Sequence, residues 1–175
     1  MLLAFRKDNR ERARRWTAAR RPGSPTMKLP PGATGFNAPL EGEADLRAFT
    51  AVCHHAVRAI GATVTAVTPA GVTPNFHEID ITHNQKQIAV LRHIALPFIA
   101  FADARASGDL TVTFVNHDEL ATAITNLPHA QVLTVDELQI PLSQVDLSAL
   151  DPHEHDQIDY WKPTTAGELL FNFWD

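Results

Sequence analysis

The sequence predicts a single α+β domain, with a four- or five-stranded, largely antiparallel sheet (a meander), helices on one face and a helical C-terminal end. Short segments in which apolar and polar residues alternate follow one another across brief turn sequences, which is typical of an antiparallel meander. Apolar residues at helical spacing precede these segments, and helix-capping patterns follow them. Residues 27–175 form a chain long enough to bury one core without covalent staples.

The first expected element is a helix over 44–60, and strands follow it. Its apolar positions recur at helical spacing and are Leu46, Phe49, Cys53, Ala56 and Ile60. Gly61 stands where a C-terminal cap belongs. The β-branched segment 63–68 and the alternating segment 75–82 are the first two predicted strands.

A hairpin is expected around the polar residues 83–86, and its register can be predicted. With the turn there, Ile79 faces Val90, Ile81 faces Ile88, His77 faces Arg92 and Phe76 faces His93. This register places apolar on apolar side chains, which is what selects a pairing. The second arm is expected to be one long strand over 87–101, with Pro97 at a bulge or an edge because proline cannot donate to a ladder. The next strand is expected over 110–115.

The C-terminal half shows three helix starts. Asn116, followed by Glu119, predicts a cap and a helix, and 131–135 is a candidate fifth strand. Asp151-Pro152 predicts a second helix, which Pro163 ends. Thr165 and Glu168 form a capping pattern for a last helix on which Leu170, Phe173 and Trp174 share one face.

The charge divides the chain at residue 27. Residues 1–26 carry eight basic and two acidic side chains, whereas residues 27–175 carry seven basic and eighteen acidic ones. We expect 1–26 to be a dispensable basic leader, which is either disordered or the result of a misassigned start, with Met27 as the true one. The other interpretations are an arm that binds nucleic acid or lipid, and a transit sequence. The acidic body should repel nucleic acid and attract basic partners.

Composition also predicts a compartment. Cys53 is the one cysteine, so no internal disulfide can form, and this suits the reducing cytoplasm. The longest apolar run, 94–102, contains nine residues and is too short to span a bilayer. We therefore expect a cytoplasmic protein without a membrane span.

No pattern predicts a cofactor, a metal or a catalytic residue. His153 and His155 flank Glu154 at a helix start, where residues two apart diverge and chelate poorly. Cys53, His54 and His55 diverge on a helix for the same reason. The glycines are scattered and form no phosphate loop.

Two regions remain as candidate binding sites. Five of the thirteen aromatic residues fall in the last sixteen positions, and part of this cluster must be core. Those selected for a binding surface are Tyr160, Trp161, Phe171 and Trp174. The alternative is a pocket at the end of the sheet near His77, Arg92 and His93, where the neighbouring arginine would keep His77 neutral and able to act as a base.

Two main functions follow from these sites. The first is a small cytosolic interaction module with an acidic surface, inhibitor-like or immunity-like towards a basic protein partner. The alternative is an enzyme or small-ligand binder at the His77/Arg92/His93 end of the sheet. A third possibility is DNA or membrane association through the leader alone. A concave site with converging polar groups would favour the alternative, and a flat acidic face edged by aromatics would favour the first.

Overall fold

The computed structural model describes residues 27–36, 43–106, 108–125 and 130–175. The predicted leader 1–26 lies outside this part of the chain. Among the described residues, no helix is both long and apolar enough to cross a membrane.

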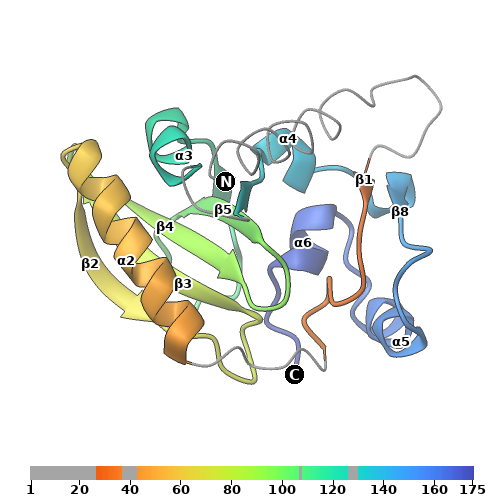
Figure 1. Cartoon of the computed structure of the whole chain (residues 1–175). Coiled ribbons are helices and arrows are strands. Elements are labelled where there is room, and N and C mark those ends of the chain that lie inside the picture. Colours follow the sequence, from red (N-terminus) through yellow and green to blue (C-terminus); the bar gives the residue numbers. More distant parts are fainter. Residues whose placement is uncertain (1–26, 37–42, 107, 126–129) are drawn as a thin grey trace, which may run out of the picture.

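The architecture is α+β, as predicted, with one mixed but mostly antiparallel sheet (Figure 1). The strands are β1 (Met27–Lys28), β2 (Thr63–Thr68), β3 (Phe76–His83), β4 (Lys86–His93), β5 (Phe98–Asp103), β6 (Phe114–Val115), β7 (Gln131–Val132) and β8 (Val145–Asp146). The helices are α2 (Glu43–Ala59), α3 (Asp118–Ile124), α4 (Val135–Leu138), the 3-10 turn η1 (Leu142–Gln144), α5 (Pro152–Trp161) and α6 (Ala166–Leu170).

The main sheet has the order β2-β3-β4-β5-β6, and β7 adds to β5 in parallel. A separate parallel pair joins β1 to β8. The predicted fifth strand is therefore present at Gln131–Val132, although it is short, because Thr134 begins α4 with a capping box.

The predicted hairpin register is confirmed. Ile79 pairs with Val90, Ile81 with Ile88, His77 with Arg92 and Phe76 with His93. The turn residues Asn84 and Gln85 both have positive φ, at 50° and 63°. Two such residues make a turn whose twist matches that of the strands.

The prediction of one long strand over 87–101 was wrong. The chain turns between His93 and Phe98, so that β4 and β5 pair antiparallel with each other. His93 holds this turn because its Nδ1 accepts from the backbone N–H groups of Ala95 and Leu96, both at 3.0 Å. Pro97, which has no N–H, lies in the turn rather than in a ladder.

The strand expected over 110–115 is reduced to Phe114–Val115. Before it, the Asp109 carboxylate accepts from the Thr111 N–H at 2.8 Å, a local turn that competes with pairing. Leu110 is 67% exposed. Alternation alone therefore overstated this strand.

Two apolar cores lie on the two faces of the sheet. On one face, α2 and α3 cover Ile79, Ile81, Val90 and Phe101. On the other, the predicted helical C-terminal end packs with β1 over Phe76, Leu91 and Phe98. Figure 1 shows α2 crossing the β2–β3 side of the sheet, with α5 and α6 at the opposite end of the molecule.

Candidate functional site

Helix α5 begins where the sequence predicts. Asp151 is its N-cap and forms a reciprocal capping box with Glu154, while Pro152 occupies the first turn. Lys162 ends the helix in the left-handed conformation, with φ of 51°, and Pro163 follows. Local signals alone are enough to place this helix.

Glu154 has a second role that the capping pattern does not reveal. Its side chain is fully buried, and its carboxylate accepts from the Gly32 N–H, the Thr34 N–H and the Thr34 hydroxyl, each at 3.1 Å, as well as from the Asp151 N–H at 3.3 Å. A buried carboxylate is tolerated only when its oxygens are well hydrogen-bonded. Glu154 therefore ties α5 to the segment after β1.

The C-terminal tail is tied to the same segment by two buried asparagines. The side chains of Asn75 and Asn172 both donate to the Thr34 carbonyl at 3.0 Å. Asn172 also donates to the Leu169 carbonyl, and Asn75 donates to the Leu170 carbonyl. These bonds satisfy carbonyls at the end of α6, which would otherwise lack partners.

The expected common face of Leu170, Phe173 and Trp174 was wrong, because α6 ends at Leu170. Phe171 leaves the helical conformation, with φ of −124° and ψ of 85°, and the Asn172 bonds hold the extended tail. Phe173 and Trp174 are half-buried. Phe171 is only 2% exposed and packs edge-on against Phe76, so it is part of the core rather than the surface.

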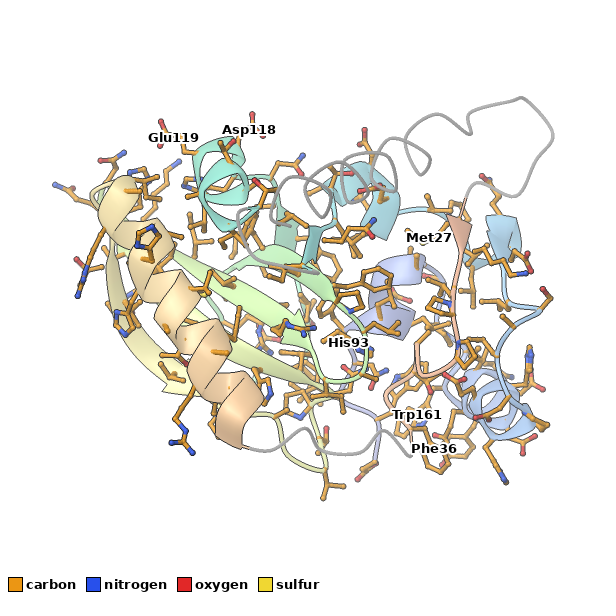
Figure 2. All side chains as sticks on the ribbon, viewed as in Figure 1. Met27, Phe36, His93, Asp118, Glu119 and Trp161 are labelled. Atoms are coloured by element: carbon orange, nitrogen blue, oxygen red, sulfur yellow. The ribbon has the colours of Figure 1, made fainter. Side chains whose placement is uncertain are left out.

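The other aromatic residues singled out in the sequence gather at the surface. Tyr160 is 76% exposed and Trp161 36% exposed, with 5.1 Å between their ring centroids. Trp174 stacks on Trp161 at 6.1 Å with the rings nearly parallel. Phe36 is 42% exposed and lies at the same end of the molecule, as Figure 2 shows. The indole N–H of Trp161 donates to Gln157 at 3.1 Å.

This region is also acidic. Exposed carboxylates accompany the aromatic rings, and we call the combined set the α5–tail surface: Phe36, Asp156, Asp159, Tyr160, Trp161, Trp174 and Asp175. A cavity of about 220 Å³ opens within it, lined in part by Phe36, Trp174 and Asp175. The charged side chains within α5 other than its histidines are acidic, and the exposed Lys162 caps the end of the helix.

The three residues of the alternative site are placed differently. His77 and Arg92 face each other across β3 and β4, whereas His93 projects from the other face of the sheet. His93 is fully buried, and its Nε2 lies 3.0 Å from the Ala33 carbonyl. Burial lowers the pKa of His93 to about 4, so its imidazole is neutral at pH 7. His77 accepts from the Ala70 N–H at 2.8 Å through Nδ1.

A second cleft, of about 590 Å³, lies at the opposite end and was not foreseen. It lies beside the β3–β4 turn and the start of α3, and we call it the His83 cleft. Its lining residues are His83, Asn84, Lys86, Gln87, Ile88, Asp103, Val115, Asn116, His117 and Glu119. Figure 2 shows Asp118 and Glu119 at this end, away from Phe36 and Trp161.

Two histidines meet in the His83 cleft. His117, not the expected Asn116, caps α3, because its Nδ1 accepts from the Leu120 N–H at 3.2 Å. Nε2 of His117 lies 3.2 Å from Nδ1 of His83. Nε2 of His83 lies 3.3 Å from the side-chain amide of Asn84 and 3.9 Å from the Glu119 carboxylate. Asn116 instead accepts from the Val135 N–H.

The carboxylates of β3, on Glu78 and Asp80, are half-buried. Glu78 pairs with Arg105, whose guanidinium lies over the Phe173 ring at 4.8 Å. Burial raises the pKa of Glu78 and of Asp80, although the charge of Arg105 opposes both shifts.

The remaining candidates lie where the spacing argument puts them. Cys53 is buried in the core, and burial raises the pKa of its thiol to about 12. His54 and His55 are exposed, as are His153 and His155. Within the described ranges, no three histidine, cysteine or acidic side chains are grouped so as to hold a metal ion.

Comparison with known proteins adds no assignment. No protein-family model matches the chain, and neither a curated protein nor a solved structure is significantly similar to it.

Proposed function

We propose that the protein is a small cytoplasmic interaction module whose α5–tail surface binds a basic protein, in the manner of an inhibitor or immunity protein. The observation that carries the proposal is the contact of Tyr160, Trp161 and Trp174 at the surface of a helix on which Asp156 and Asp159 are exposed. Exposed aromatics with few rotatable bonds are frequent energetic centres of protein interfaces.

The polar groups beneath this surface support the same interpretation. The carboxylate of Glu154 and the amides of Asn75 and Asn172 are engaged in internal hydrogen bonds. They hold α5, the tail and the 32–34 segment in one arrangement. A surface that is already ordered loses little conformational entropy when it binds.

Charge supports a basic partner. The body has eighteen acidic against seven basic side chains, and the surface residues Asp156, Asp159 and Asp175 are exposed. Complementary charge accelerates association and excludes acidic partners. The partner should therefore bind more weakly as salt is raised.

The test is affinity purification of the full chain from its own cells, with mass spectrometry of the captured proteins. We expect a basic protein that is lost from the double variant Tyr160→Ala/Trp161→Ala and reduced in Asp156→Asn/Asp159→Asn. The matched control is Asp118→Asn/Glu119→Gln, which removes the same charge from α3 and should leave capture unchanged. Capture that is insensitive to the α5 variants and sensitive to the α3 variant would overturn the proposal.

A second candidate function rests on the His83 cleft. Its volume and its converging polar side chains are typical of small-molecule sites, and His83 offers an imidazole beside Glu119. An enzyme or ligand binder would use this cleft rather than the region of His77, Arg92 and His93. If the cleft binds a small molecule, a thermal-shift screen of small metabolites should find a compound that raises the melting temperature of the native chain but not that of His83→Ala. A screen without such a compound would count against it.

A further inference from the structure

Strand β2 is an unusually open sheet edge. It is six residues long and pairs only with β3 among the described residues. The other side of the sheet ends in β6 and β7, which have two residues each. An edge strand exposes a row of unpaired backbone N–H and C=O groups, which is a template for another strand.

The usual protections of an edge are mostly missing here. Proteins blunt exposed edges with charged side chains, prolines or very short strands, and residues 63–68 contain no charge and no proline. Five of the six residues are exposed, including Val67 at 40%. One irregularity is present, a bulge between Val64 and Ala66.

The sequence of β2 is complementary to itself when read in the opposite direction. If a second copy approaches antiparallel, with the two-fold axis between residues 65 and 66, Thr63 lies opposite Thr68 of the second copy. Val64 then lies opposite Val67, and Thr65 opposite Ala66. Threonine–threonine and valine–valine pairs are both favourable across antiparallel strands.

The faces of the strand agree with this register. Val64 pairs with Ile81 and Val67 with Ile79, so both valines project towards the α2 side of the sheet. Thr63 and Thr68 project to the other side. The bulge lies at the proposed axis. Because it adds one residue between Val64 and Val67, both valines project to the same face of the sheet although they are three residues apart.

Helix α2 lies beside the same edge. It packs against the core beside β2, and Figure 1 shows it crossing this part of the sheet. Its exposed residues include Ala48, Ala51 and Ala59 but also Arg47, His54, His55 and Arg58. The pairing proposed below therefore rests on the strand alone.

We propose that the chain forms a two-fold symmetric dimer in which the β2 strands of two copies pair antiparallel and join the two sheets. The partner of β2 is a second copy of the chain, because the β2 strands of two copies present the same residue types on the same faces to each other. Neither strand carries a charge, even though the rest of the body is acidic. The α5–tail surface lies at the opposite end from β2 (Figure 1), so the dimer would present two such surfaces. This inference does not depend on the proposed function.

The test is the mass of the full chain in solution, measured by light scattering over a range of concentrations. We expect a species of twice the 19.3 kDa chain mass. Val67→Lys places a charge inside the new ladder and should raise the dimer dissociation constant about a hundredfold. The control Val72→Lys changes a residue that is 88% exposed outside the strand and should leave the dimer intact.

A pair of cysteines tests the register itself. Thr63 and Thr68 are separated by roughly 16 Å along one extended strand, so they cannot bridge within one chain. In Thr63→Cys/Thr68→Cys, oxidised glutathione should yield a covalent dimer, whereas Thr63→Cys alone should not, because position 63 faces position 68. A monomer at all concentrations, a dimer that Val67→Lys does not weaken, or no covalent dimer from the double variant would each overturn the proposal.

Discussion

The two ends of the molecule differ in how deeply their polar side chains are buried. At the α5 end, Glu154, Asn75 and Asn172 are buried, and their hydrogen bonds are made to backbone and side-chain groups of the same chain. At the other end, His83, His117 and Glu119 line a cleft of about 590 Å³.

This difference decides what each end offers to a partner. Where the polar groups are buried, the groups left at the surface are aromatic rings and carboxylates, and these suit a large, basic partner. Where polar groups line a cleft, they suit a small molecule. Substituting the buried polar groups should lower the free energy of unfolding more than substituting the polar groups of the cleft.

The largest effect is expected at Glu154. In Glu154→Ala, the N–H groups of Gly32 and Thr34 lose their acceptor, and a buried donor without a partner costs about 1–3 kcal/mol. We expect the free energy of unfolding to fall by about 3 kcal/mol or more in chemical denaturation. Asp156→Ala on the same helix is the control and should change it by less than about 0.5 kcal/mol. Equal effects would mean that α5 is not anchored through Glu154.

A pH-dependent loss of similar size is expected from His93. Its pKa is lowered from 6.5 to about 4 in the folded state, so the unfolded chain binds the proton more readily. Stability from this residue is therefore full above about pH 6.5 and is lost as the pH falls towards 4, by about 3 kcal/mol in total. Glu78 and Asp80, whose pKa values are raised, act in the opposite direction at the acidic end of this range.

The variant His93→Gln isolates that contribution. It should be less stable at pH 7, since Gln cannot reproduce all the bonds of the imidazole, but its stability should decline less steeply between pH 6.5 and 4. The measurement is chemical denaturation at several pH values for both proteins. Parallel profiles would show that His93 is not held neutral by burial.

At the cleft end, a smaller effect is expected from His117. Removing the cap in His117→Ala should cost about 1 kcal/mol, and His117→Asp should recover most of it, because aspartate also accepts from the Leu120 N–H. Thermal or chemical denaturation of the three proteins checks this. A loss as large as that of Glu154→Ala would contradict the contrast between the two ends.

A similarly small effect on stability is expected at Trp174. Truncating a fully buried aromatic residue costs roughly 3–5 kcal/mol, but the Trp174 ring is half-buried and stacks on Trp161 at the surface. Trp174→Ala should therefore cost only about 1 kcal/mol, while capture of the partner is lost. A large drop in melting temperature would restore a core role for this residue.

Features that depend on residues close together in the sequence could be predicted, and features that depend on residues far apart could not. The β3–β4 register was predictable because both arms alternate around a short turn, and the start of α5 because Asp151 and Glu154 cap it locally. The end of α6 was not, because it depends on Asn75, 97 residues before Asn172.

The same limit applies to the sites. Tyr160 and Trp161 could be selected because aromatic residues are concentrated near the C-terminus, and the structure places both at the surface. The His83 cleft could not be foreseen, since His83 and His117 are 34 residues apart and neither lies in a recognisable motif. Glu154 was visible only as a cap, because its bonds to Gly32 and Thr34 are made across the fold.

The most direct test of the central proposal is site-specific photo-crosslinking in the protein's own cells. A photoreactive phenylalanine analogue replaces Tyr160 on the α5–tail surface or, as a control, Leu110, which is also exposed. After illumination, we expect a covalent adduct with a basic protein from position 160 and none from position 110. Adducts from position 110 alone, or an acidic protein at position 160, would contradict the assignment of the α5–tail surface as the binding site for a basic partner.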